Sequence, residues 1–500
     1  MANWYIEYAD IAVGADQATT ITATGAADFS NLGRVPYGAT DGSYITLEHN
    51  NWVLDGTFTP LPTSENNLGF FSESLSKADC SFATNPTITA TLSDLFSSSG
   101  IQFDFSRALN DFAASLTLTW FHDETQLATA DFTPNDPVFF CRQEVESYNK
   151  VVVEFKTTSK PYQRVKLAEL AYGYFIKFEP IDCISISITQ QLDPIAAILP
   201  ESKLNFEINT LANVSFMFQE KQPVTVYLED DSVLGAFYIK SSKQPSIHRY
   251  TLECEDAIGV LSDIPYTPTI YTTATNAKTV VQSILGDRFS LSWSADIEDE
   301  TIKGYISAKT AREAIQQICF AIGAVCHTAN YNGLTITKLS TDNTALVQTA
   351  NIYSGNSIER NAVLTSLNIL AHSYEETADE SGNDVIKIQT GDGTKYYKHS
   401  TAKTTIENPN IARSAKRNVF EINDATLVNS DNVATIAQRV YDFLLKTSTH
   451  NVKFKRTSAD EKLGAYIQAQ TPFGDNAAGF LESATITLSG IIAIDGRYKF

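Results

Sequence analysis

Apolar and polar residues alternate in short runs along most of this chain, and a period of two is typical of β-strands with one buried face. Before residue 176 such runs include Ile88–Leu92, Ile101–Phe105 and Val151–Lys156, with turn-forming residues between them. Short strands that follow one another this closely favour a β-sandwich or jelly roll. We therefore predict an all-β domain over residues 1–175.

The alternation continues over residues 176–264 and predicts a small β-barrel there. Within it, two alternating strands flank a polar Lys243-Gln244-Pro245 turn, and the second strand ends at Asp256 before a short apolar run. We expect Asp256 to cap the backbone N–H groups of the turn that follows. An apolar run that ends at Pro200 is read as a turn of helix or a projecting loop. The barrel strand before the polar turn would carry Phe237, Tyr238 and Ile239.

Residues 265–345 change to a helical period and predict an α/β module. Asn276 is placed to cap a short helix that Gly286 ends. Thr310 and Glu313 have the spacing of a capping box, so a second helix is expected behind them. The apolar face of that helix would carry Ile315, Ile318 and Ile322.

Residues 346–500 return to alternating strands and contain one helical pattern, preceded by Ser430 and Asp431. We predict a second barrel with one helix, followed by C-terminal strands. The predicted fold class is therefore mainly β and multidomain (α+β): a β-sandwich or jelly roll, then small β-barrels linked by an α/β module. A chain of 500 residues is too long for one core, which agrees with several domains.

The charge balance narrows the classes of partner. The net charge is −21, from 37 basic and 58 acidic residues, and no local basic stripe is present. A negative field repels duplex DNA and anionic membranes, so we expect no specific nucleic-acid binding. No apolar run reaches the roughly 18 residues of a membrane span. The first residues have no basic and no apolar segment of a signal peptide, so none is expected.

The sequence predicts no catalytic, cofactor-binding or metal-ligating residues. The six cysteines form no C-x-x-C pair, and no two of the seven histidines have helical i, i+4 spacing. His122 lies beside two acidic residues, but a solvated hairpin tip explains that group better than a metal site. The acidic stretch Asp379–Asp384 lacks the distal glutamate of a calcium loop and is read as a polar turn.

The order of segments after residue 176 resembles the hub proteins at the tip of phage tails and of related contractile particles. The resemblance is carried by Gly235–Ile239, Tyr250–Leu261 and the helix–hairpin unit at Ala311–Val325. It implies a structural virion protein at the tail tip or baseplate, assembled in the host cytoplasm, with no enzymatic activity. It also implies a homotrimer in which two similar barrels per chain form a near-sixfold ring. That ring would meet a hexameric tail tube on one side and a tip, spike or fibre on the other, around a channel for DNA.

The N-terminal domain resembles a discoidin-type sandwich over roughly residues 65–172. The residues that carry this resemblance lie in Leu68–Ser76, Asn85–Thr89, Ser99–Phe105, Leu118–Phe121 and Tyr148–Phe155. It implies an alternative function, a tail protein that binds a receptor or a cell-wall glycan on the host surface. The candidate contacts are Trp52, Phe70, Phe71 and Tyr37, of which Trp52 and Phe71 suit a core equally well. A second alternative is a peptidoglycan hydrolase, but the two resemblances leave little room for a catalytic domain.

Overall fold

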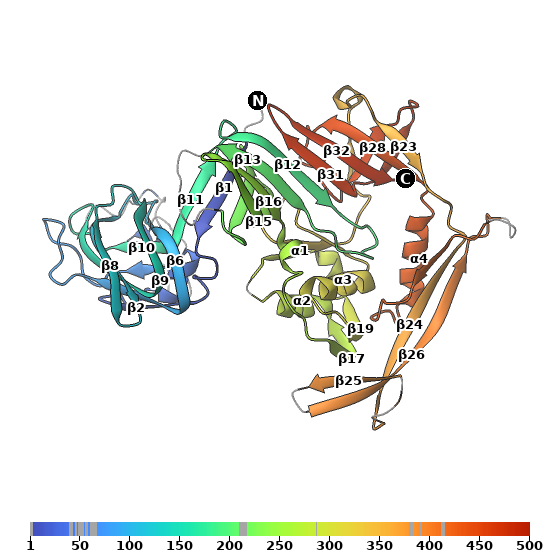
Figure 1. The fold of residues 1–500 in the computed structure, drawn as a ribbon, viewed down its shortest axis with the longest axis horizontal. Coiled ribbons are helices and arrows are strands. Elements are labelled where there is room, and N and C mark those ends of the chain that lie inside the picture. Colours follow the sequence, from blue (N-terminus) through green and yellow to red (C-terminus); the bar gives the residue numbers. More distant parts are fainter. Residues whose placement is uncertain are drawn as a thin grey trace. The chain divides into compact units, whose positions relative to one another are not determined.

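The computed structural model (Figure 1) describes residues 4–39, 44–45, 48, 55, 59–60, 68–209, 218–286, 288–379, 382, 384–390, 393–411 and 416–500. Its internal contacts divide the chain into two units. The sandwich unit comprises Tyr8–Lys177 and Ala212–Gln222, and the sheet unit comprises Met1–Glu7, Phe178–Leu211 and Pro223–Phe500. The break after Lys177 lies close to the predicted domain end at residue 175.

The sandwich unit is built on two long strands that bend. Its sheet has the order β5-β10-β6-β9-β7-β8, and β2 pairs with the first half of β6. Bulges between Thr91 and Gly100 bend β6, so its second half can pair with β10 instead. Alternate residues of the second half, from Ile101 to Phe105, are fully buried, as the sequence pattern predicts. The strands are β2 (Thr19–Thr24), β5 (Phe70–Phe71), β6 (Thr87–Phe105), β7 (Ala113–His122), β8 (Thr125–Phe132), β9 (Val138–Thr158) and β10 (Lys166–Ala171).

The sheet unit contains one continuous antiparallel run of strands in the order β14-β15-β16-β13-β12-β31-β32-β28-β23. These are β12 (Cys183–Gln191), β13 (Lys203–Asn209), β14 (Pro223–Leu228), β15 (Val233–Ser246), β16 (Arg249–Glu255), β23 (Ser357–Arg360), β28 (Ser448–Lys455), β31 (Ser483–Leu488) and β32 (Ile492–Lys499). Strands from both predicted barrels therefore share one sheet. Alternation predicts where strands lie and which face is buried, but it does not choose their partners.

A helical layer packs beside this sheet and contains the predicted caps (Figure 1). Asn276 accepts a hydrogen bond from the Thr279 amide at 3.0 Å, and Thr310 and Glu313 form both bonds of the capping box. Ile315, Ile318 and Ile322 are buried in the core of the unit, as expected. The elements of this layer are α1 (Ala257–Val260), β17 (Thr269–Asn276), α2 (Ala277–Leu285), β18 (Leu291–Trp293), η2 (Ala295–Ile297), β19 (Thr301–Ile306), α3 (Ala311–Ile322), β20 (Val325–His327) and β21 (Leu334–Thr337).

The last third of the chain adds a helix and two smaller sheets, in the orders β25-β26-β24-β27 and β22-β29-β30. They consist of β22 (Thr344–Leu346), η3 (Thr349–Asn351), β24 (Ser366–Thr377), β25 (Val385–Thr390), β26 (Gly393–Glu407), β27 (Val419–Ile422), α4 (Val433–Leu444), β29 (Tyr466–Gln470) and β30 (Asn476–Phe480).

The remaining elements are β1 (Trp4–Ile11), η1 (Leu32–Tyr37), β3 (Tyr44–Ile45), β4 (Thr59–Pro60) and β11 (Gly173–Phe178). Mainly β, multidomain architecture is thus confirmed.

The turn of the β15–β16 hairpin differs from the prediction. The sequence placed it at Lys243-Gln244-Pro245, whereas β15 continues to Ser246 and the chain turns at Ile247 and His248. The register shifts between Lys243 and Ser246, so Pro245 lies in a bulge where its missing N–H breaks no ladder hydrogen bond.

Asp256 makes the predicted cap and two further bonds. Its Oδ1 accepts from the Gly259 amide at 3.0 Å, which caps α1. Its Oδ2 accepts from the Ser202 amide at 2.9 Å and from the Thr328 hydroxyl at 2.6 Å. Burial raises the pKa of this fully buried carboxyl, while these hydrogen bonds lower it. One side chain therefore links the start of β13, the start of α1 and the segment after β20.

Replacing Asp256 with alanine leaves three buried donors without an acceptor, at about 1–3 kcal/mol each. We expect Asp256→Ala to lower the free energy of unfolding by about 3 kcal/mol or more, measured by urea denaturation. The matched control is Asp230→Ala, which removes a carboxylate that accepts from Ser232 in an exposed turn. Equal losses in the two variants would contradict the junction role of Asp256.

His450 on β28 is held as a neutral ring. The Tyr498 hydroxyl donates to the Ala477 carbonyl at 2.9 Å, so in the 2.6 Å bond between His450 Nδ1 and that hydroxyl the ring nitrogen is the donor. In the described part of the chain, Nε2 of His450 has no partner. Burial lowers the pKa of His450 to about 4, since a proton added at Nε2 would have no acceptor.

This depressed pKa predicts a loss of stability in acid. Above about pH 6.5 the ring is neutral in both states and adds no pH dependence. Between about pH 6.5 and pH 4 the unfolded chain binds a proton at this histidine and the folded chain does not. The free energy of unfolding therefore falls as the pH falls, by about 1.4 kcal/mol per pKa unit of the difference between the two states. We expect the free energy of unfolding to fall less steeply over this range in His450→Gln than in the parent. Exposed His248→Gln is the control; parallel curves for the parent and His450→Gln would refute the assignment.

Candidate functional site

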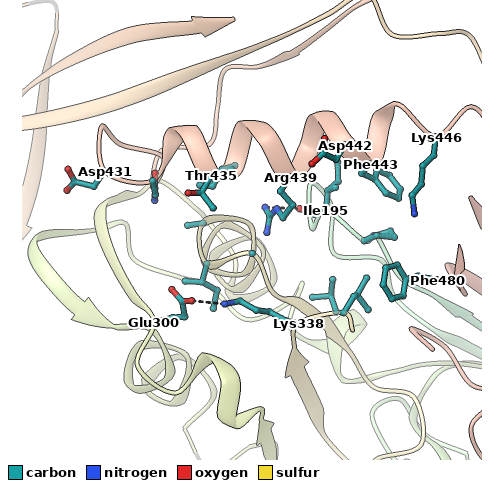
Figure 2. A pocket seen from close by; sticks show the side chains of 18 residues that line it. Ile195, Glu300, Lys338, Asp431, Thr435, Arg439, Asp442, Phe443, Lys446 and Phe480 are labelled. Atoms are coloured by element: carbon teal, nitrogen blue, oxygen red, sulfur yellow. Dashed lines mark hydrogen bonds and ion pairs between the residues drawn. The ribbon is translucent and has the colours of Figure 1, made fainter. Parts of the chain in front are cut away.

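A cavity of about 560 Å³ lies in the sheet unit, between the C-terminal end of α3, the helix α4 and the loop after β12 (Figure 2). Arg439 projects from α4 toward the loop residue Ile195, and the pair Glu300–Lys338 lies across the cavity from the helix (Figure 2). Segments that are distant in sequence therefore form one pocket.

Arg439 connects these segments. Its Nη2 donates to the Phe320 carbonyl at 2.7 Å and to the Ile195 carbonyl at 3.4 Å, and the guanidinium lies 5.4 Å from the centre of the Phe320 ring. The last carbonyls of a helix lack partners within the helix and attract a positive charge. Burial lowers the pKa of Arg439 to about 10, so the group remains charged at neutral pH. Its Nε and Nη1 have no hydrogen-bond partner among the described residues.

Gly323 makes room for this arginine. It ends α3 in the left-handed conformation, with φ of +74°, where glycine is favoured. A Cβ at this position would lie only 2.7 Å from Arg439 Nη1. Any larger residue would therefore strain the turn and displace the guanidinium.

The loop after β12 packs inward. Ile195, Ala196 and Leu199 are buried, and Gln316 Nε2 donates to the Ala196 carbonyl at 2.6 Å. Ile198 is 63% exposed. The run is a loop and not a turn of helix, but it does not project as predicted, because most of it packs against α3.

The remaining walls mix charge and aromatic surface. Glu300 and Lys338 form an ion pair at 2.8 Å, and Lys446 Nζ lies 5.7 Å from the centre of the Phe480 ring. Asp442 accepts from Gln438 Nε2 at 2.7 Å. The lining residues contain no histidine or cysteine that could act as a base or thiol nucleophile.

Three of the four predicted glycan contacts, Phe70, Phe71 and Tyr37, lie within the described residues. Phe70 and Phe71 are buried in the sandwich unit, and Phe71 packs edge-on against Phe29 at 5.4 Å, so both serve as core residues. Tyr37 is 49% exposed at the end of η1, and Trp52 lies outside the described residues. A glycan role for Tyr37 stays a prediction.

The predicted structural residues of the barrel strand lie in the sheet unit. Phe237 and Ile239 are buried, and Tyr238 is partly buried against Phe289, with ring centres 5.7 Å apart. Sequence reasoning missed Arg439. The available signal was its position, one residue before Val440 and three after Ile436, on the buried side of an otherwise apolar helix face.

Two further findings concern the described residues as a set. Within them, no three histidine, cysteine, aspartate or glutamate side chains are grouped so that they could hold a metal ion. None of the helices in the described ranges has the length and hydropathy of a membrane span.

Solved structures of tail proteins are similar to this chain. A tail protein from Neisseria meningitidis MC58 is 14% identical, with a TM-score of 0.47, over 65% of this chain and 94% of the other. The 43 kDa tail protein of prophage MuSo2 from Shewanella oneidensis is 12% identical, with a TM-score of 0.44, over 64% and 95%.

The comparison is weaker for a sugar-binding sandwich. The family 32 carbohydrate-binding module of NanJ from C. perfringens, solved with galactose, is 14% identical, with a TM-score of 0.21, over 34% of this chain and 99% of the module. No protein-family model and no curated protein sequence matches the chain.

If Arg439 holds the pocket together, removing its charge should loosen α3, α4 and the loop. Arg439→Met keeps most of the aliphatic stem but leaves the Phe320 carbonyl without its donor. We expect the free energy of unfolding to fall by about 1–3 kcal/mol. Lys446→Met, which removes a cation at the pocket rim, is the matched control and should change it by less than about 1 kcal/mol. If chemical denaturation gives the same free energy of unfolding for Arg439→Met and the parent, the arginine is not needed to hold the pocket together.

Proposed function

We propose that this chain is a structural component of a phage tail and forms the hub at the tail tip or baseplate. The observation that carries the proposal is the shared sheet of the sheet unit, in which β12 pairs with β31. Strands of residues 183–255 and strands of residues 357–499 lie on the two sides of this pairing. Each subunit thus contributes two groups of strands, and three subunits around an axis would contribute six.

The pairing of β12 with β31 gives the two groups a fixed spacing. Ser187 lies opposite Thr487 and Ile188 opposite Ile486, and both isoleucines are buried. Backbone hydrogen bonds and core packing together make this a rigid joint, unlike two domains on a flexible linker. A ring that meets a hexameric tube needs such fixed spacing, because each half of a subunit must reach its own tube contact.

The charge of the chain fits a channel wall. A net charge of −21 repels the phosphate backbone, so DNA would pass such a wall without binding to it. In this proposal the partners are two further copies of the chain, the hexameric tail tube, and a tip, spike or fibre protein. The sandwich unit would then contact neighbouring subunits. Glycan binding and peptidoglycan cleavage remain the alternatives.

The hub proposal predicts a trimer at micromolar concentration and a complex with the tail-tube ring. Sedimentation with mass determination should give three times the mass of 55.0 kDa, and class averages should show threefold symmetry. A chain that stays monomeric both alone and with the tube protein would overturn the proposal. Clearing of a peptidoglycan gel by the purified chain would favour the hydrolase alternative, and co-sedimentation with host cell walls would favour the glycan-binding one.

A further inference from the structure

The turn of the β15–β16 hairpin forms an exposed basic tip, defined here as residues 240–249. It contains two lysines, one histidine and one arginine but no acidic residue, although the chain as a whole is strongly acidic. Lys240 and Arg249 at its base are paired with Glu255 and Glu207. Lys243 is exposed and has no ion-pair partner in the described part of the chain.

An apolar side chain stands at the end of this basic tip. Ile247 is 66% exposed, and Gln244 Nε2 donates to its carbonyl at 3.2 Å, which holds the turn in shape. Burying an exposed isoleucine is worth about 1.5–3 kcal/mol. A fixed turn that presents one apolar side chain beside a free cation is suited to insertion into a hollow of opposite charge.

Such a hollow exists elsewhere on the sheet unit. An acidic groove of about 240 Å³ lies between α3 and β27 with the segment after it. Its charged lining residues are Glu421 and Asp424, and neither forms an ion pair within the described ranges. Phe320 and Phe420 supply apolar wall, and Phe420 is 37% exposed. Glu421 Oε1 accepts from Asn368 Nδ2 at 3.0 Å. The groove therefore places two carboxylates without an ion-pair partner in the described ranges beside an apolar surface.

We infer that the basic tip of one copy of this chain docks in the acidic groove of the next copy. In this arrangement Ile247 contacts the exposed ring of Phe420, and Lys243 meets the carboxylates of Glu421 and Asp424. The inference rests on the proposed function, because it supplies the contact between neighbouring subunits of the hub. The commitment to a second copy comes from charge complementarity within one acidic chain, whose basic residues are the minority.

The symmetry of this contact fits a ring. The two surfaces are different patches of the same unit, so the interface is heterologous and propagates from copy to copy. A heterologous contact closes into a ring when its rotation divides a full turn, and otherwise it continues as an open filament. Closure after three copies gives the trimer that a hub requires.

Charge reversal tests the contact in the full-length chain. Lys243→Glu and Asp424→Lys should each raise the dissociation constant for self-assembly by on the order of tenfold, measured by analytical ultracentrifugation. The double variant carries both reversals in every copy and should recover assembly, because the opposite charges meet again. Lys77→Glu, an exposed lysine of the sandwich unit, is the matched control for the change in net charge. A thermal unfolding midpoint equal to that of the parent shows that each variant folds.

A second measurement locates the contact directly. Ile247→Cys and Phe420→Cys chains, mixed and mildly oxidised, should form a reducible cross-link between the two variants and much less within either one alone.

If the parent assembles and both charge-reversal variants assemble equally well, the docking inference falls and the hub proposal stands. If the reversals weaken tail-tube binding but not self-assembly, the occupant is the tube and not a second copy. A parent that is monomeric alone and with the tube protein removes both proposals.

Discussion

The antiparallel pairing of β12 with β31 is the contact on which the rest of the sheet unit depends. It joins residues 187–191 to residues 483–487. Forming this pairing therefore closes a loop that contains most of the residues of the sheet unit. Closing so long a loop costs conformational entropy, and this cost grows with loop length. It is offset only by contacts that form once the loop is closed. The buried isoleucines on both strands contribute to those contacts. Without this pairing, the two groups of strands would each end in an unpaired edge.

The side chains of Asp256 and Arg439 fix the helical layer and α4 around the sheet. The first accepts hydrogen bonds and the second donates them. The carboxylate of Asp256 collects three donors from three segments, and the guanidinium of Arg439 donates to carbonyls of two segments. Each gathers backbone groups that local secondary structure leaves unpaired. Removing either side chain leaves these groups without a hydrogen-bond partner in a buried position, which is costly. The two groups therefore fix the helical layer and α4 in place by hydrogen bonds between segments that are distant in sequence.

Features of this fold that depend on a few neighbouring residues could be predicted from the sequence. The Thr310–Glu313 capping box and the Asn276 cap are local patterns, and Asp256 was placed correctly as a cap. The Ser202 and Thr328 bonds of Asp256, the shared sheet and the position of Arg439 depend on residues far apart in sequence, so alternation and capping rules cannot reveal them. A proline next to polar residues predicts a turn at Pro245, but a β-bulge accommodates this proline within β15. Phe70 and Phe71 are buried by residues distant in sequence, so their core role does not follow from the local pattern. The local pattern gave the elements, and long-range contacts decided which residues form the pocket.

The edge of the shared sheet explains why subunits would recognise one another by side chains. The strand β23 at its end is four residues long, and its exposed residues Ser357, Glu359 and Arg360 are polar or charged. Short, charged edge strands resist the addition of another strand, which would otherwise extend the sheet without limit. A heterologous contact made by a turn in a groove has a defined angle, whereas pairing of strand edges permits slipped registers. A particle that needs a closed ring of fixed size therefore gains from a blocked sheet edge together with a separate, charge-matched contact between copies.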